Sequence, residues 1–311
     1  MDQINETTQR KKIPAEAVEL YSKFIHGEID RRGFFEGVKR YAVGGLTATA
    51  LVDALMPNYA LGQQVRKDDE RIKASYETVP SPMGNGNMKG YFARPFSQDT
   101  RDAMPTKLPG VLVIHENRGL NPHTEDVARR FALENFIAFA PDALTSMGGY
   151  PGDDYRAGQM FGKLDAMKRT QDFIAAARWL KAHPLCNGQL ACTGFCFGGS
   201  MTNNLSVLLG ADMNAVAPFY GAAPNPMDMP KVKAAVLVHH GALDKMLSGA
   251  YPAQEAELKK NNIRYEGHIY PNSVHGFFND ATPERYNKAA AQQAWTRTIE
   301  WFNQYARGAK A

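Results

Sequence analysis

Three residues of the types that form nucleophilic triads occur along this chain in the order Cys196, Asp244, His275. Cys196 lies in the glycine-rich stretch "GFCFGG" (194–199), after an apolar run and before a helix-like run. A thiol on a tight strand-to-helix turn can act as a nucleophile, because the amide groups and positive end of the following helix stabilise a thiolate and later an oxyanion. The flanking glycines leave room for the backbone to cross closely there.

Other roles for Cys196 have to be weighed against catalysis. If Cys192 and Cys196 share a strand, they are separated by roughly 13 Å, whereas a disulfide needs Cα atoms within about 7 Å. The spacing C-x-x-x-C has no companion C-x-x-C or H-x-x-x-H, so no metal site is predicted. The stretch is not G-x-G-x-x-G, which argues against a dinucleotide site. A buried, inert cysteine stays the alternative, since free cysteine is among the most buried residue types.

From about residue 70, apolar runs of strand length alternate with segments of helical periodicity. This alternation predicts an α/β domain with a mostly parallel sheet covered by helices on both faces. A hairpin over 71–79 and 87–95 precedes it. The remaining strands are expected at 110–116, 135–142, 189–195, 213–221, 234–241 and 264–271. The helices are expected at 121–134, 168–183, 200–210, 250–262 and 283–308.

Functional groups in such sheets gather at the carboxyl ends of the strands. Cys196, Asp244 and His275 each follow a different predicted strand, and nucleophile–acid–histidine is the chain order of an α/β-hydrolase triad. The rival histidines, His240 and His268, fall within or beside strands. The plainer alternatives are a surface-turn aspartate at 244 and a loop histidine at 275 that only bonds backbone.

The chain resembles the dienelactone hydrolase family over roughly residues 70–307, in a longer bacterial subgroup with an N-terminal extension. Four motifs carry the resemblance: "HENRGL" (115–120), "GFCFGG" (194–199), "PFYG" (218–221) and "VHGF" (274–277). The resemblance implies an α/β-hydrolase fold and a hydrolase that cleaves carboxylic ester or lactone bonds.

The resemblance also implies a role for each site residue. Cys196 would attack the carbonyl carbon, His275 would serve as base and acid, and Asp244 would hold the histidine tautomer. The backbone N–H groups of Asn117 and Phe197 would form the oxyanion hole. No cofactor is expected, because the nucleophile carries the chemistry, and the expected partner is a small ester or lactone.

Glu116 follows the first parallel strand. The resemblance implies that Glu116 takes the thiol proton when substrate binds, which would spare the enzyme a permanent, oxidisable thiolate. The alternative is a strand-end carboxylate paired with Arg118.

Substrate charge is the point at which the sequence departs from well-known members of the family. Those members hold a substrate carboxylate with two arginines, but the position four residues after His275 is Asn279, and the loop 143–155 contains no arginine. Neutral esters or lactones are therefore predicted. The substrate-binding candidates are Arg118, Tyr150, Arg156, Tyr220 and Phe277.

The N-terminal part, residues 1–68, reads as a helical extension before a catalytic domain at 69–311. Arg31 and Arg32 precede an apolar run, as in a twin-arginine export signal, although Asp53 interrupts that run. The run is too short to span a bilayer. The extension is otherwise expected to pack on the main domain or on a second subunit, giving a homo-oligomer. Cytoplasm is favoured over export to the periplasm, because a catalytic thiol stays reduced there.

Composition restricts the class of protein further. The net charge is only +4, and no basic block is interleaved with aromatic residues, which argues against a nucleic-acid partner. Two other functions stay open: a thioesterase or acyl-transfer enzyme with the same triad, and a binding or stress protein that kept the fold. The intact triad disfavours the latter.

Overall fold

The computed structural model describes residues 13–25, 28–42, 47–96 and 107–307. The chain divides into two compact units, a smaller one of Met1–Pro57 with Thr282–Glu284 and a larger one of Asn58–Ala281 with Arg285–Ala311. Residues 58–68, assigned to the extension from sequence, group with the larger unit.

The smaller unit contains the helices α1 (Ala15–Ile25), α2 (Arg31–Lys39) and α3 (Ala48–Leu55). The Asp30 side chain caps α2 by accepting a hydrogen bond from the Gly33 N–H at 2.7 Å, so the two arginines begin a helix. The core of this unit includes Tyr21, Phe34, Val38, Leu51 and Leu55. Among the described residues, no helix has the length and apolar character needed to cross a membrane. Export and self-association through this segment stay predictions.

The larger unit is built on one eight-stranded sheet in the order β1-β2-β4-β3-β5-β6-β7-β8. The pairs β1–β2 and β2–β4 are antiparallel, and all later pairs are parallel. This topology confirms the predicted mostly parallel α/β sheet. The strands are β1 (Ile72–Ser81), β2 (Gly86–Pro95), β3 (Leu108–Ile114), β4 (Ile137–Pro141), β5 (Cys186–Phe195), β6 (Ala215–Phe219), β7 (Ala235–Gly241) and β8 (Tyr265–Tyr270).

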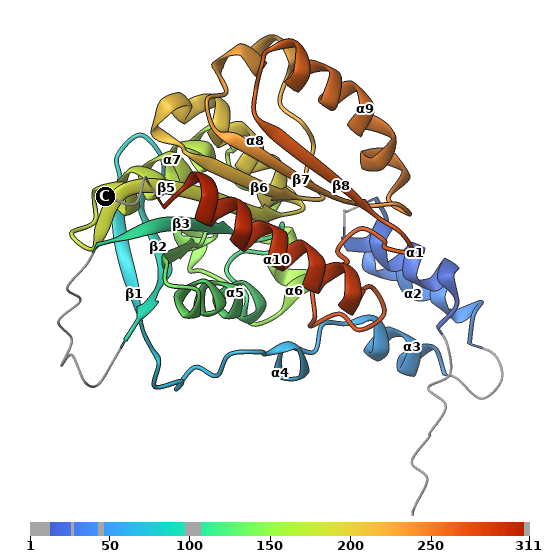
Figure 1. Cartoon of the computed structure of the whole chain (residues 1–311). Helices are drawn as coiled ribbons and strands as arrows, with labels where there is room; N and C mark the ends of the chain where they lie inside the picture. Colours follow the sequence, from blue (N-terminus) through green and yellow to red (C-terminus); the bar gives the residue numbers. More distant parts are fainter. Residues whose placement is uncertain (1–12, 26–27, 43–46, 97–106, 308–311) are drawn as a thin grey trace, which may run out of the picture. The chain divides into compact units, whose positions relative to one another are not determined.

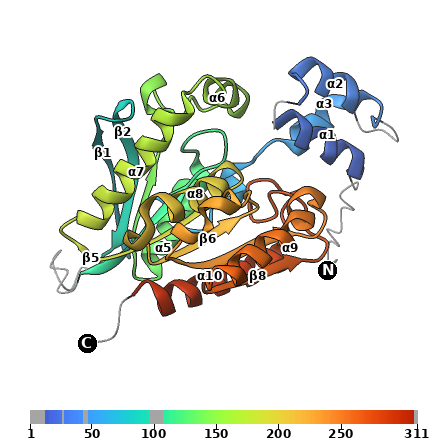
Figure 2. The same ribbon diagram turned by 90° about the horizontal axis from the view of Figure 1, so that it is seen from above.

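Helices cover both faces of this sheet, and each face has its own apolar core (Figures 1 and 2). On one face lie α5 (Pro122–Leu133) and α10 (Lys288–Tyr305), and on the other lie α7 (Ala166–Ala182), α8 (Phe197–Leu209) and α9 (Lys245–Lys260). Strands buried on both faces explain the continuous apolar runs in the sequence. The short helices are α4 (Tyr59–Gly62), α6 (Asp154–Phe161) and the 3₁₀ segments Thr145–Met147, Gly210–Asp212 and Pro226–Lys231.

Several helices differ from the sequence prediction, most of all at their first residues. The closing helix begins at Lys288 rather than 283, because Asn287 caps it with a hydrogen bond from the Ala290 N–H. Helix α9 begins at Lys245, five residues before the predicted start at 250, because the Asp244 side chain caps it. Helix α6 was not predicted, since it is short and buries only two of its residues.

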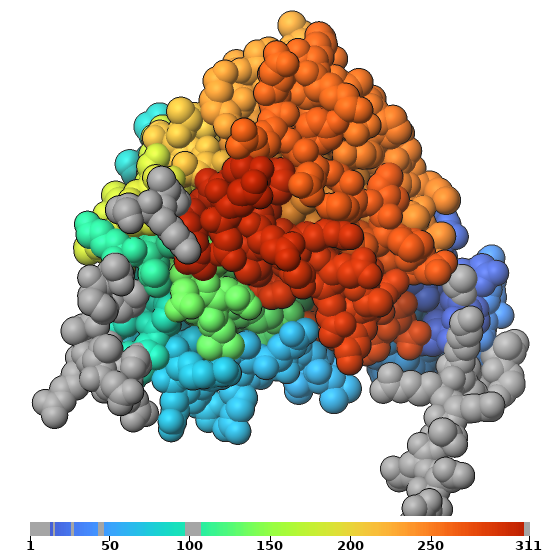
Figure 3. All heavy atoms as spheres, viewed as in Figure 1, coloured from blue at the N-terminus to red at the C-terminus, as the bar shows by residue number. Residues whose placement is uncertain are grey.

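The segment 58–66, here called the strap, runs along the surface of the larger unit as a light-blue band (Figure 3). The backbone N–H groups of Gln64 and Val65 both donate to the Asp126 carboxylate of α5, at 3.2 and 2.8 Å. The Gln64 side chain donates to Asp280 at 2.7 Å. The strap is therefore fixed by polar contacts with two distant parts of the chain.

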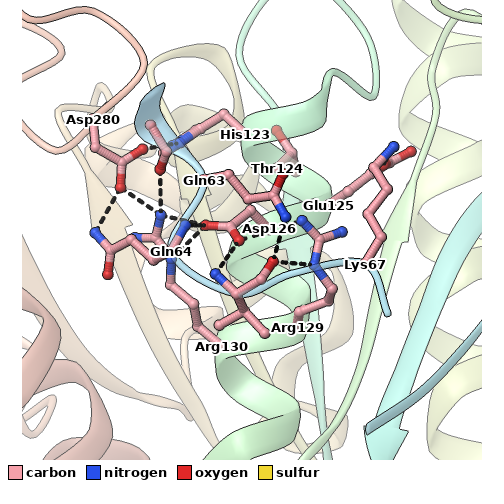
Figure 4. A network of polar contacts seen from close by, with 12 residues as sticks. Gln63, Gln64, Lys67, His123, Thr124, Glu125, Asp126, Arg129, Arg130 and Asp280 are labelled. Carbon is pink, nitrogen blue, oxygen red and sulfur yellow. Dashed lines mark hydrogen bonds and ion pairs between the residues drawn. The ribbon is translucent and has the colours of Figure 1, made fainter. Parts of the chain in front are cut away.

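The carboxylate of Asp126 lies at the centre of a buried charge network (Figure 4). Arg129 and Arg130 both bond to Asp126, and Arg130 also bonds to Asp280. Arg129 donates a further hydrogen bond to the Val65 carbonyl at 2.9 Å. Each buried charge thus has an opposite charge beside it, which is the condition for burying ions at tolerable cost.

We predict that Asp126→Ala lowers the free energy of unfolding of the larger unit by about 3–5 kcal/mol, because it leaves buried arginines without their central carboxylate. Denaturant titration followed by circular dichroism measures the change. Asp228→Ala, which removes the exposed partner of Lys231, is the control and should shift the midpoint little. Equal effects of the two substitutions would contradict a structural role for the network.

Candidate active site

The thiol of Cys196 is presented by a sharp turn between β5 and α8. The backbone of Cys196 has φ 55° and ψ −112°. Residues other than glycine rarely adopt a positive φ. A Cβ on Gly194 would lie 2.3 Å from the Gly198 carbonyl oxygen, and one on Gly198 would lie 2.2 Å from that of Ile114. No larger residue fits at either position, so the glycines of the motif are required by the crossing of the backbone.

Backbone hydrogen bonds hold this turn in place. The Cys196 N–H donates to the Phe219 carbonyl at the end of β6, at 3.1 Å, and the Cys196 carbonyl accepts from Ser200 at 3.0 Å. Cys196 is partly exposed, whereas Cys186 and Cys192 are buried, and all three are free cysteines. Cys196 is thus the cysteine with access to solvent, and α8 begins directly after it.

His275 and Asp244 lie together at the same edge of the sheet. His275 Nδ1 is 2.6 Å from Asp244 Oδ2, and both side chains are largely buried. Asp244 follows β7 and caps α9, and His275 lies in the loop after β8. The rival histidines His240 and His268 lie within β7 and β8, as predicted.

The pKa values in this group show how its charges interact. Burial would lower the pKa of His275, but the negative charge of Cys196 and the hydrogen bond to Asp244 outweigh burial and raise it to about 10. Burial would raise the pKa of Asp244, yet the hydrogen bond from His275 prevails and lowers it. The imidazolium form of His275 is therefore favoured between an anion on each side.

The loop after β3 carries Glu116 and Asn117, and His115 fixes it. His115 Nε2 accepts the backbone N–H of Ala143 at 3.1 Å, so Nδ1 carries the proton and donates to the Glu116 carbonyl. Burial lowers the pKa of His115, which keeps the ring neutral for this role. The Asp142 carboxylate orders the adjoining loops by accepting hydrogen bonds from the N–H groups of Leu120, Leu144 and Tyr150.

The Glu116 side chain is buried, with 8% of it exposed. Burial would raise its pKa, but the positive charges of Arg285 and then Arg118 outweigh that effect and lower it. Arg285 is itself buried and packs on the backbone of Gly276, where a Cβ would lie 2.7 Å from its Nη1. Arg285, which lies ten residues after His275 in the chain, therefore belongs to the group around Glu116.

Arg118 faces a second carboxylate, that of Asp154. Arg118 Nη1 is 3.7 Å from Asp154 Oδ2, with the Arg118 side chain buried and that of Asp154 largely so. The same carboxylate accepts hydrogen bonds from the hydroxyls of Tyr150, at 2.8 Å, and Tyr59, at 2.9 Å. Asn121 completes the cluster by donating to the Tyr59 hydroxyl at 3.0 Å.

The structure does not bring all the predicted substrate-binding residues together. Arg156 is exposed on α6, away from the buried charges, because its helix packs through Ala157 and Phe161. Phe277 is fully buried in the core and contacts Tyr220 at a ring distance of 5.7 Å. Tyr220 packs against the His275 ring at 4.9 Å.

Arg285, Asp154 and Tyr59 were missed by reasoning from the sequence. Arg285 lies within "PERYN" (283–287), which the sequence assigns to a helix, and Tyr59 lies in the part assigned to the extension. No motif marks any of the three residues. The one usable signal was the need for charge pairing. If Glu116 and Arg118 are buried, each requires an oppositely charged partner elsewhere in the chain.

Comparison with known proteins shows the family to which this chain is similar. The model of the dienelactone hydrolase family matches residues 89–306. A protein of Escherichia coli O157:H7 called "Putative carboxymethylenebutenolidase" is 30% identical over 256 residues, covering 78% of this chain and 90% of that protein. A shorter Escherichia coli K12 protein, "Putative hydrolase fragment YghX", is 50% identical over 120 residues, or 39% of this chain and 97% of its own.

Solved structures show the same similarity. The crystal structure titled "Putative Dienelactone Hydrolase", from Klebsiella pneumoniae, is 27% identical and has a TM-score of 0.64, covering 75% of this chain and 99% of that one. The dienelactone hydrolase of Anabaena variabilis is 19% identical and has a TM-score of 0.59. It shows the same fold over 76% of this chain and 100% of that one. With the family model matching most of the chain, this protein belongs to the dienelactone hydrolase family of α/β hydrolases.

Proposed function

We propose that this protein hydrolyses carboxylic esters or lactones with Cys196 as nucleophile, His275 as base and acid, and Asp244 as the residue that orients His275. The observation that carries the proposal is the 2.6 Å contact between His275 and Asp244, next to a cysteine held at φ 55° on a strand-to-helix turn. Nucleophile, base and orienting acid in mutual contact are the geometric signature of this chemistry.

The reaction proceeds in two stages. The Cys196 sulfur attacks the carbonyl carbon and forms a C–S bond, while the carbonyl π electrons move onto the oxygen, which accepts hydrogen bonds from the N–H groups of Asn117 and Phe197. Collapse of this intermediate breaks the C–O bond, and His275 gives its proton to the leaving alcohol. Water then attacks the thioester, His275 takes a proton from that water, and the acid leaves as the thiolate is restored.

Two groups compete for the proton of the Cys196 thiol. The raised pKa of His275 supports the imidazole as acceptor in the resting enzyme, since an imidazolium is stabilised beside Asp244. The cations around Glu116 lower its pKa and make it the weaker base at rest. We propose that Glu116 becomes the acceptor when a bound neutral substrate excludes water from its carboxylate and so raises its pKa, and that the proton then reaches the leaving alcohol through His275.

The charges of the site also support a neutral substrate. Arg118 lies beside Asp154, and Arg285 interacts with Glu116, so both arginines near the thiol already face a carboxylate of the chain. A substrate carboxylate would have to displace one of these internal partners. A carboxylate desolvated without such displacement costs several kcal/mol.

We predict that Cys196→Ala abolishes ester hydrolysis, with a loss of about 10⁴-fold or more in kcat, while circular dichroism shows an unchanged fold. Cys192→Ala is the matched control, because burial raises the pKa of the Cys192 thiol to about 12 and makes it unreactive. The assay is release of p-nitrophenol from a short-chain ester. If Cys196→Ala retained a tenth of the wild-type activity, Cys196 could not be the nucleophile.

Glu116→Gln should slow acylation roughly 10²-fold or more while leaving substrate binding nearly unchanged, because glutamine keeps the shape of glutamate and cannot accept the proton. Stopped-flow measurement of the first turnover separates acylation from later steps. Wild-type acylation with reduced thermal stability would instead assign Glu116 to balancing the charges of Arg118 and Arg285.

The neutral methyl ester of a carboxylated lactone should be preferred over the free acid, by about 30-fold or more in kcat/KM, the scale of one lost buried charge contact. The two compounds share a reacting ring, so the ratio isolates the charge. Preference for the acid would show that Arg118 or Arg285 leaves its internal partner to bind substrate.

A further inference from the structure

The hydroxyl of Tyr220 is buried without a hydrogen-bond partner. Tyr220 directly follows β6, only 1% of it is exposed, and its Oη contacts no donor or acceptor among the residues that the structure describes. Buried tyrosine hydroxyls usually find a partner, since burying one unpaired destabilises the folded state. A partner supplied from outside the chain resolves this imbalance.

The backbone of Tyr220 is fixed by the contacts that fix the nucleophile. The preceding carbonyl, that of Phe219, accepts the Cys196 N–H at 3.1 Å, and the Tyr220 N–H donates to the His239 carbonyl at 2.8 Å. Tyr220 has φ 37°, an uncommon value for a residue with a side chain. Backbone strain of this kind persists where surrounding contacts enforce a particular side-chain direction.

The ring of Tyr220 packs edge-on against His275, with centroids 4.9 Å apart and planes at 60°. Burial, and then the negative charge of Glu116, raise the pKa of Tyr220 well above its usual range, and Cys196 adds to this effect. The hydroxyl therefore keeps its proton at neutral pH, in the electrostatic field of Glu116, Arg285 and Cys196. It is a hydrogen-bond donor on a ring that packs against the proposed catalytic histidine and follows the residue bonded to the Cys196 backbone.

We propose that the Tyr220 hydroxyl donates a hydrogen bond to a further substrate oxygen near the reacting ester group, so that the preferred substrates are esters or lactones that carry an oxygen in addition to the two of that group. This inference rests on the proposed function. The carbonyl oxygen itself has its own donors in the N–H groups of Asn117 and Phe197, which leaves the tyrosine for a neighbouring ether, hydroxyl or ring oxygen. An analogue with carbon at that place leaves the buried hydroxyl unpaired and is discriminated against.

Two pairs of esters test the proposal on the acyl and alcohol sides. On the acyl side, p-nitrophenyl methoxyacetate is compared with p-nitrophenyl butyrate; on the alcohol side, 2-methoxyethyl butyrate is compared with butyl butyrate in a pH-stat. Each pair differs by oxygen in place of one CH₂. The quantity measured is the ratio of kcat/KM within a pair, for wild type and for Tyr220→Phe, because dividing one ratio by the other cancels intrinsic reactivity.

We expect the preference for oxygen in one of the two pairs to fall roughly tenfold to a hundredfold in Tyr220→Phe, the effect of removing a buried donor from its acceptor. The kcat/KM of the carbon-bearing esters should fall less than that of the oxygen-bearing esters. The melting temperature of the variant should rise, by up to about 4 °C, because an unpaired buried hydroxyl has been removed.

Tyr270→Phe is the matched control. Tyr270 is also buried and packs on Phe277, but its hydroxyl contacts His239 Nδ1 at 3.0 Å and accepts from Arg297 at 3.1 Å. Removing this paired hydroxyl should lower the melting temperature and leave both ester ratios unchanged.

The outcomes separate this inference from the function on which it rests. Hydrolysis of all four esters with unchanged ratios in Tyr220→Phe, or a lower melting temperature of that variant, overturns the role of Tyr220 alone. Hydrolysis of none of them by the wild type overturns the proposed function and this inference together.

Discussion

The close crossing of the backbone at Gly194 and Gly198 sets the geometry on which the site depends. The chain leaves β5, reverses through Cys196 and enters α8 within van der Waals reach of itself and of the β3 end at Ile114. The same crossing places Cys196 where Phe219 can accept its N–H. One steric constraint thus orients the thiol, directs the start of α8 toward it and connects it to the loops after β3 and β6.

Around that crossing, each carboxylate lies near a positively charged side chain of the same chain. Asp244 faces His275, Glu116 interacts with Arg285, and Asp154 receives Arg118 and two tyrosine hydroxyls. In a medium of low dielectric such matching is what lets a polar centre be assembled on an apolar sheet. The proposed preference for neutral substrates follows from the same matching, since a charge brought by a ligand would have to be exchanged for one that the chain already supplies.

The sequence predicted the parts of this structure that are encoded locally. The runs that became β3 to β8 and the order of Cys196, Asp244 and His275 could be read because hydrophobic periodicity and strand-end position are short-range properties. Arg285 and the contact between Tyr59 and Asp154, which are 95 residues apart, could not, because they arise only when distant segments meet. The start of α10 at Lys288 was missed for a related reason: the asparagine that caps it lay inside an otherwise helical pattern.

The strap has a consequence for how the protein is made. Gln64 bonds to Asp280, a residue 216 positions later in the chain. At roughly 5–20 residues per second, the ribosome needs about 10–40 s after Gln64 before Asp280 is synthesised. During that interval Asp126 and Arg130 can form their helical pair and receive the strap, but the last carboxylate of the network is absent. The buried charges of this unit are therefore completed only near the end of translation, together with the loop that carries His275.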